Sequence, residues 1–204
     1  MININDNKNS MEKIENRLLS FYKYFTKFYY GPINYVEQLL AHHFASIPLC
    51  LLGDAGTGKT LLAELLHYLH DQDISRIFYF KAREDIDKFL ATINLRKLQE
   101  LGRVDQAIEF ILPENLRVLI IDEWLRGMRE TLQALLQITE EKSFNYGTAR
   151  ISWKDLSIIM TANPIEKSPD IIIPPEHLLN RINNIWIPTL GLNWQIMWEP
   201  QKTY

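Results

Sequence analysis

The sequence predicts an α/β fold in which helices cover both faces of a five-stranded parallel sheet. Five short apolar runs alternate along the chain with stretches of helical periodicity, and this alternation is typical of parallel sheets. The runs are largely apolar, as strands buried on both faces should be. A glycine-rich turn follows the first run, at the edge where such sheets bind ligands. The expected strands are residues 48–53, 76–80, 117–121, 157–161 and 184–188.

The composition is that of a soluble globular protein. Of the 204 residues, 47% are hydrophobic and 23% are charged, and the net charge of −3 gives no basic field that would favour nucleic acid. The single cysteine, Cys50, excludes an internal disulfide. The first residues lack a signal-peptide pattern, and no apolar run approaches the ~20 residues that span a bilayer. We therefore expect a cytoplasmic protein without a nucleic-acid or membrane partner.

One domain is expected, with a short tail at each end. Residues 1–10 are polar and rich in asparagine, which predicts a disordered tail. Residues 11–190 should form the domain, beginning with a helical segment over 11–45. Residues 191–204 are a short tail rich in tryptophan, which is either a seal over the sheet edge or a docking surface.

The stretches between the strands predict helices, a hairpin and a long insert. Leucines recur every three or four residues over 59–70 and 128–141, and predict two helices that each bury one face. Residues 81–116 are charged and predict at least one helix around 84–101. Residues 143–155 alternate around a glycine and predict a β-hairpin.

The glycine-rich turn matches a phosphate-binding motif. Residues 53–60 fit G-x-x-x-x-G-K-[ST] between an expected strand and an expected helix, which is the context that the motif requires. The glycines let backbone N–H groups point at phosphate oxygens. Lys59 would contact the β- and γ-phosphates, and Thr60 would bind Mg²⁺. The motif predicts these nucleotide-binding residues: Gly53, Asp54, Ala55, Gly56, Thr57, Gly58, Lys59, Thr60 and Leu61.

Two acids end the third expected strand. Because parallel strands present their carboxyl ends at one edge, Asp122 and Glu123 should lie near the phosphate-binding turn. Asp122 would hold the metal, directly or through water. Glu123 would orient the attacking water or accept its proton. Together with the turn, these residues predict one site for ATP and Mg²⁺.

Two more side chains are candidates for catalysis. Asn163 follows the fourth expected strand and could hydrogen-bond the attacking water or the γ-phosphate; an Asn-Pro turn without a catalytic role is the alternative. Arg181 precedes the last expected strand and could reach the γ-phosphate in a neighbouring subunit. Without that context, a lone arginine more often forms a surface salt bridge.

The order of these motifs resembles the MoxR-type AAA+ ATPases, including the RavA branch. The similarity covers roughly residues 31–188, and its motifs are specific as a combination rather than singly. The densest matches are residues 121–127 (IDEWLRG), 135–144 (LLQITEEKSF), 161–166 (TANPIE) and 174–181 (PPEHLLNR).

This resemblance implies an AAA+ P-loop ATPase that forms hexameric rings and remodels a protein partner, often one with a von Willebrand factor A domain. Arg181 matches the arginine finger that acts on the neighbouring subunit, and Arg126 matches a basic position near the subunit interface. The hairpin at 143–155 matches the insertion before the sensor strand, and residues 81–116 match the segment that faces the central pore.

The family continues after the last strand into a helical lid domain. This sequence ends at Tyr204, so we expect a truncated homologue or a lid that another subunit supplies. Two other functions remain open, because they would use the same motifs. One is a DNA-directed ATPase of replication or transposition, and the other is a nucleotide-gated assembly module with weak turnover.

Overall fold

A five-stranded parallel sheet forms the centre of the protein. The computed structural model describes residues 4–28, 33–70, 77–82, 90–164, 174 and 176–187. The strand order is β2-β5-β8-β1-β9, and all neighbours are parallel. Each of the five expected strands is confirmed to within two residues of its predicted bounds. The strands are β1 (Leu49–Leu52), β2 (Ile77–Lys81), β5 (Val118–Asp122), β8 (Ser157–Ala162) and β9 (Asn183–Trp186).

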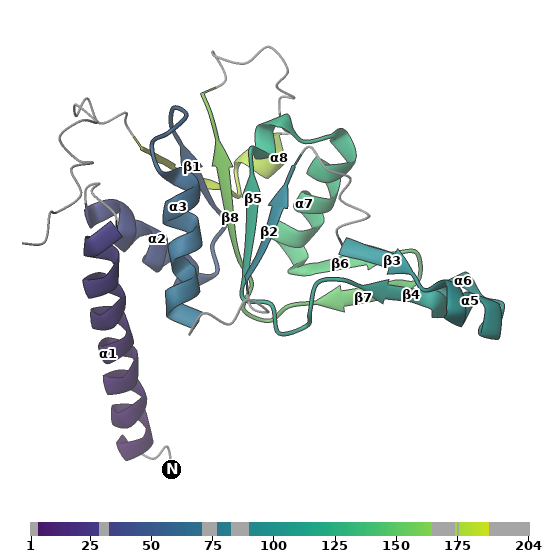
Figure 1. Cartoon of the computed structure of the whole chain (residues 1–204), viewed down its shortest axis with the longest axis horizontal. Coiled ribbons are helices and arrows are strands. Elements are labelled where there is room, and N and C mark those ends of the chain that lie inside the picture. Colours follow the sequence, from purple (N-terminus) through teal and green to yellow (C-terminus); the bar gives the residue numbers. More distant parts are fainter. Residues whose placement is uncertain are drawn as a thin grey trace, which may run out of the picture.

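Helices cover both faces of this sheet, as predicted (Figure 1). On one face lie α1 (Ile4–Phe28), α2 (Ile33–Ala45) and α3 (Lys59–Glu64), and on the other lies α7 (Arg129–Glu141). α3 continues directly into a 3₁₀ helix, η1 (Leu65–His70). The expected helix over this segment is therefore present, but its second half is more tightly wound.

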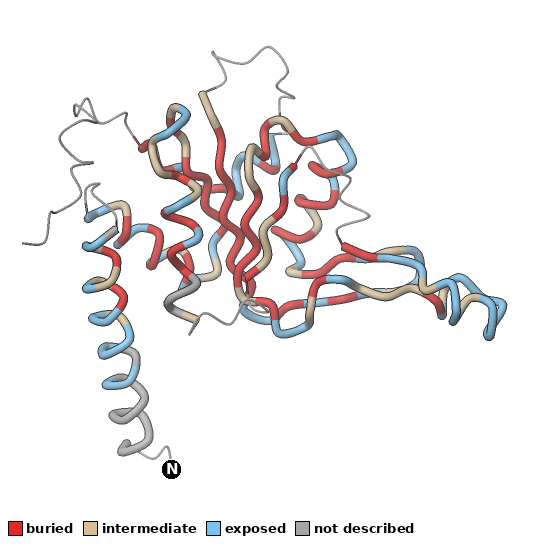
Figure 2. Tube along the Cα trace, viewed as in Figure 1, coloured by how far each residue is buried: buried red, intermediate tan, exposed pale blue. Residues whose placement is uncertain are grey.

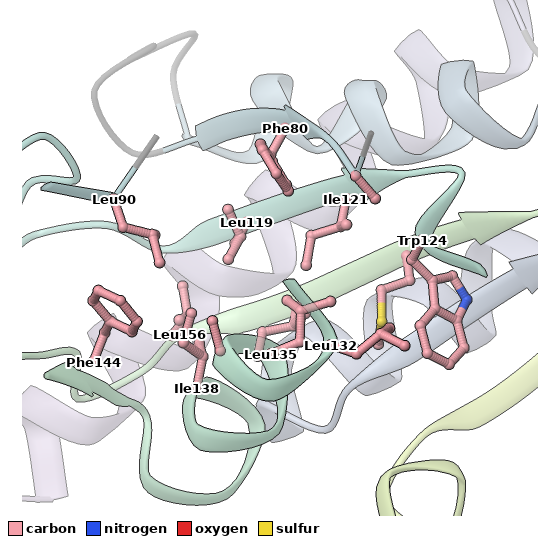
Figure 3. Close-up of a cluster of buried hydrophobic side chains, with 14 of the residues drawn as sticks. Phe80, Leu90, Leu119, Ile121, Trp124, Leu132, Leu135, Ile138, Phe144 and Leu156 are labelled. Atoms are coloured by element: carbon pink, nitrogen blue, oxygen red, sulfur yellow. The ribbon is translucent and has the colours of Figure 1, made fainter. Parts of the chain in front are cut away.

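The strands of the sheet are buried along most of their length (Figure 2). Alternation along these strands divides the core into two clusters. Val118 and Ile120 of β5 pack in the cluster that contains α1, α2 and α3, whereas Leu119 and Ile121 pack in the cluster that contains α7. Successive strand residues point to opposite faces, so one apolar strand contributes to both clusters. Figure 3 shows the second cluster, in which side chains of β5 and α7 meet. These clusters fix the strand ends at which the polar residues lie.

Two antiparallel ribbons extend from one side of the sheet and form an arm (Figure 1). The arm is defined by residues 91–110 and 143–152. The expected hairpin over 143–155 is confirmed as one of its ribbons. The elements of the arm are β3 (Ala91–Ile93), α5 (Leu95–Leu101), α6 (Val104–Ala107), β4 (Ile108–Phe110), β6 (Ser143–Tyr146) and β7 (Ala149–Ser152).

The helix expected around 84–101 is wrong over its middle part. Residues 91–93 form β3, and the helix α5 begins only at Leu95. The side chain of Asn94 accepts hydrogen bonds from the backbone N–H groups of Arg96 at 3.0 Å and Lys97 at 3.2 Å. This N-cap fixes the helix start, and the β-branched residues before it favour a strand. Residues 83–89 lie outside the described part of the chain.

Near the N-terminus, the helix begins earlier than predicted. α1 starts at Ile4, so residues 4–10 form helical turns instead of the expected disordered tail. Asparagine and aspartate cost only a few tenths of a kcal/mol each within a helix, about as much as many ordinary residues, and extending an existing helix is cheap. Phe21 and Phe25 bury the other end of α1 in the core.

The expected tail over 191–204 lies outside the described residues. No described helix is both long and apolar enough to cross a membrane.

A buried histidine joins α2 to η1. His43 is 8% exposed, and its Nε2 lies 3.3 Å from Nε2 of His70. Within the described residues, the Nδ1 atom of His43 has no hydrogen-bond partner. Burial, followed by the charges of His70 and Arg117, lowers the pKa of His43 from 6.5 to about 4. The folded protein therefore holds His43 neutral.

We expect the protein to lose stability as the pH falls below the ordinary pKa of histidine. In the unfolded chain His43 takes up a proton near pH 6.5, but in the folded protein only near pH 4. The folded protein is fully stabilised above pH 6.5. As the pH falls from 6.5 to about 4, the free energy of unfolding decreases, and the loss is roughly 2 kcal/mol at about pH 5. Urea unfolding at neutral and acidic pH measures the loss. His43→Leu should remove it, whereas His177→Leu at an exposed position should not. An unchanged pH dependence in His43→Leu would contradict this assignment.

Candidate nucleotide-binding site

The phosphate-binding loop, Gly53–Thr60, connects the end of β1 with the start of α3. Gly58 has a φ of 83° at the N-cap of α3, a left-handed conformation that favours glycine. At Gly53, an added β-carbon would lie 2.3 Å from the carbonyl oxygen of Ile187, which follows β9. Glycine is therefore required at the start of the loop by close packing and at its end by backbone conformation.

Lys59 lies at the centre of the site. Its ammonium group donates hydrogen bonds to the carbonyl oxygens of Gly53 at 2.9 Å and Asp54 at 2.7 Å, and to Oδ1 of Asn163 at 3.2 Å. Burial lowers the pKa of Lys59, and the nearby charge of Asp122 opposes that shift. Asn163 extends beyond the end of β8, so the expected sensor residue lies beside the expected phosphate-binding lysine.

Asp122 lies at the end of β5 and accepts hydrogen bonds from two threonine hydroxyl groups. Thr60 Oγ1 donates to Asp122 Oδ1 at 3.3 Å, and Thr161 Oγ1 of β8 donates to the same oxygen. The pKa of Tyr79 on β2 is raised, chiefly by burial and then by the Asp122 carboxylate. Thr60 and Asp122 therefore come together as the motif spacing predicted.

Glu123 has an unusual backbone conformation next to Asp122. Its φ is 52°, in the left-handed region that non-glycine residues adopt only at a cost. Its N–H donates to Thr161 Oγ1 at 3.1 Å. Its carboxylate lies 3.2 Å from a guanidinium nitrogen of Arg126, in η3 (Trp124–Arg126). The carboxylate of Asp122 is thus held by threonine hydroxyl groups, whereas that of Glu123 is held by Arg126.

Thr161 and Tyr79 are site residues that sequence analysis did not identify. Each is a polar residue within a largely apolar strand, and Thr161 is only 1% exposed. Threonine and tyrosine are common in strands, so their presence alone gives no functional signal. The register provides the missing information, because β5 pairs with β2 on one side and with β8 on the other.

The other predicted residues of the loop lie around its outer side. Ala55 and Gly56 are exposed, and the hydroxyl of Thr57 donates to the carbonyl oxygen of Asp54 at 3.0 Å. Leu61 is 42% exposed, so the prediction that it lies on the buried face of its helix is wrong. The leucine repeat supplies more apolar residues than that face can bury, and Leu62 takes the buried position.

Arg181 makes its contacts away from the loop. Its guanidinium pairs with Glu140 at the end of α7 and donates to the carbonyl oxygen of His177 in α8 (Glu176–Leu179). The side chain is 39% exposed. The structure therefore places Arg181 on the surface, as expected of a residue that acts outside its own subunit and equally of a surface salt bridge.

The oxygen donors of the site fit a magnesium ion with a triphosphate. Thr60 and Asp122 offer a hydroxyl and a carboxylate oxygen that are hydrogen-bonded to each other. Mg²⁺ is typically bound by one or two such groups together with phosphate oxygens and water. No cluster of three or more His, Cys, Asp and Glu side chains that could hold a metal ion occurs among the described residues.

The comparison with known families decides the classification. Residues 48–173, more than half of the chain, match the AAA domain of the dynein-related subfamily. The chain belongs to this family. The matched residues include the strands β1, β2, β5 and β8 of the parallel sheet and the phosphate-binding loop. No match was found among curated proteins.

Two solved structures share the fold of this AAA domain. A crystal structure of a candidate ATPase from Cytophaga hutchinsonii ATCC 33406 has a TM-score of 0.65 and 18% identity, over 94% of this chain and 56% of that one. NtrX from Brucella abortus, in complex with ADP, has a TM-score of 0.50 and 19% identity, over 78% of this chain and 36% of that one. This chain thus spans just over half the length of the first protein. At such identities, both similarities concern the fold alone.

Proposed function

We propose that this AAA domain is a MoxR-type ATPase that forms rings and couples the hydrolysis of Mg²⁺-ATP to the remodelling of a protein partner. One observation carries the proposal. Lys59 contacts Asn163, and Thr60 contacts Asp122, so three separate motifs meet at one end of the sheet. Phosphate binding, metal binding and activation of water require this convergence.

The proposed roles follow from these contacts. Lys59 neutralises charge on the β- and γ-phosphates, and Thr60 and Asp122 hold Mg²⁺, which supplies further charge neutralisation when it is bound. Glu123 accepts a proton from the attacking water. Asn163, hydrogen-bonded to Lys59, moves to the γ-phosphate and so distinguishes ATP from ADP.

The surface of the arm supports a protein partner over a nucleic acid. Leu95, Leu101 and Val104, at its tip, are 50% to 70% exposed. Two basic residues of the arm are paired with acids, in the ion pairs Lys97–Glu109 and Arg103–Asp105. Exposed apolar side chains with balanced charge are typical of protein contacts. By resemblance to its family, the partner would carry a von Willebrand factor A domain.

Release of phosphate from ATP tests the activity directly. We expect the purified chain to release phosphate with Mg²⁺ present and to stop when the metal is chelated. Native mass measurement with ATP and Mg²⁺ should show a hexamer. A chain that binds no ATP contradicts the proposed site. A chain that binds ATP and assembles without turnover would be an assembly module, and salt-dependent binding of DNA would favour a DNA-directed ATPase.

Replacing Arg181 with alanine should separate ATP binding from hydrolysis. We expect nucleotide affinity to be retained, because Arg181 contacts α7 and α8 rather than its own loop. Hydrolysis in the assembled protein should fall by about tenfold or more, since a neighbouring subunit loses a charge that stabilises the transition state. Turnover as a function of protein concentration measures the effect. Glu140→Gln, which breaks the same ion pair but keeps the guanidinium, is the matched control. Normal turnover in Arg181→Ala would show that Arg181 does not act on a neighbouring subunit.

A further inference from the structure

We propose that Thr161 is a positioning residue that ties the sensor strand to both acids of the site. The proposal rests on the proposed ATPase function and adds a residue that acts through Asp122 and Glu123. Its hydroxyl donates a hydrogen bond to Asp122 Oδ1 and accepts one from the N–H of Glu123 at 3.1 Å. One buried hydroxyl thus connects the expected metal ligand with the expected general base.

The strand register explains how Thr161 reaches both residues. β8 lies between β5 and β1, and Met160 is paired with Ile121. The next residue on each strand is then Thr161 and Asp122, at the same edge of the sheet. Thr161 is 1% exposed and is paired with Leu51 of β1, so neighbouring strands hold its backbone on both sides. The hydroxyl therefore has a fixed position from which to orient its partners.

The two hydrogen bonds have different consequences. The bond to Asp122 orients the carboxylate that would hold the metal, and outer hydrogen bonds of this kind tune metal affinity. The bond from Glu123 holds the backbone in its left-handed conformation, which would otherwise be costly. Loss of the hydroxyl should therefore weaken binding of the metal and misplace the base.

Tyr79 provides an internal comparison, because the same carboxylate contributes to the raised pKa of its hydroxyl. Tyr79→Phe removes this hydroxyl from the surroundings of Asp122 and leaves the bond between Thr161 and Glu123 intact. Thr161→Val removes both functions with almost no change in shape. The pair of variants therefore separates orientation of the metal ligand from orientation of the base.

Thr161 also connects Asn163 with these acids. The two residues are separated by Ala162 alone, and Asn163 contacts Lys59 across the site. A change in the contacts of Asn163 when the γ-phosphate leaves would act on the same strand end that holds Asp122 and Glu123. Thr161 is thus placed to couple the state of the nucleotide to the geometry of the metal ligand and the base.

The test combines a binding measurement with a rate measurement. For each variant, titration with Mg²⁺ at a fixed concentration of a fluorescent ATP analogue gives the metal concentration at half-maximal binding. Phosphate release at saturating Mg²⁺ gives kcat. Thr161→Val should raise the metal requirement by roughly tenfold and lower kcat by roughly tenfold or more. Tyr79→Phe should raise the metal requirement but lower kcat less, and Thr161→Ser should restore both values towards wild type.

Two controls separate this role from general stability. Thr131 is fully buried in α7, and its hydroxyl has no hydrogen-bond partner in the part of the chain that is described. Thr131→Val therefore makes the same chemical change away from the site and should leave the metal requirement unchanged. If Thr161→Val does not fold, Thr161→Ala carries the same expectation.

Specific outcomes overturn the proposal. An unchanged metal requirement in Thr161→Val, or a kcat lowered no more than in Tyr79→Phe, would show that Thr161 does not position these acids. Failure of the proposed function is different, because the wild-type chain would then release no phosphate, while its Mg²⁺-dependent binding could still be compared among the variants.

Discussion

Replacing Lys59 with alanine is expected to abolish tight binding of ATP. The ammonium group is buried and makes hydrogen bonds to Gly53, Asp54 and Asn163, so it lies where the loop and the sensor residue meet. Its loss removes the only positive side chain that the phosphate-binding motif supplies. Loss of about 3 kcal/mol of charge-assisted hydrogen bonding corresponds to an affinity roughly 100-fold weaker. Titration with a fluorescent ATP analogue measures the change.

The control for this variant is Lys154→Ala, which removes a lysine from an exposed turn. It should bind ATP as the wild type does. Thermal unfolding of both variants without nucleotide shows whether the fold is retained, since Lys59 also stabilises the empty loop. Tight binding by a folded Lys59→Ala protein would overturn the assignment of the site.

Replacing Glu123 with glutamine is expected to preserve ATP binding and nearly stop hydrolysis. Glutamine keeps the shape of the side chain but cannot accept the proton of the attacking water. Removing a general base typically lowers the rate by about 100-fold or more. The hydrogen bond from the backbone N–H to Thr161 should survive, so the site should remain assembled. Single-turnover measurement of phosphate release, with bound nucleotide identified after rapid filtration, should show trapped ATP.

Two further variants make this experiment selective. Glu130→Gln alters an exposed acid at the start of α7 and should hydrolyse ATP at the normal rate. Arg126→Gln removes the guanidinium that holds the Glu123 carboxylate but keeps the carboxylate itself. Normal turnover in Glu123→Gln would show that another group activates the water.

Much of the fold could be predicted from the sequence because its signals are local. The strands are short apolar runs, and the loop has a spacing of glycine and lysine that backbone chemistry dictates. Asp122 could be placed near Thr60 because parallel strands end at a common edge, and the two side chains are in contact. The hairpin over 143–155 followed from alternation around a glycine.

Other features depend on contacts between segments distant in sequence. Thr161 gains its two partners from the register of β8 against β5, which no local pattern encodes. The strand at 91–93 exists because it pairs with residues 108–110 across two helices. α1 extends to Ile4 through residues with weak helical preference. For Thr161 and for the strand at 91–93, the deciding interaction lies outside the window over which periodicity can be recognised.

The arm would amplify a movement of α7. Only Lys142 separates the end of α7 from the ribbon β6–β7, and α7 follows the segment that carries Glu123 and Arg126 (Figure 1). When a rigid lever pivots at its base, displacement grows in proportion to the distance from the pivot. A tilt of α7 too small to disturb the packing of the core would therefore become a larger displacement at Leu95 and Leu101, which are 70% and 50% exposed.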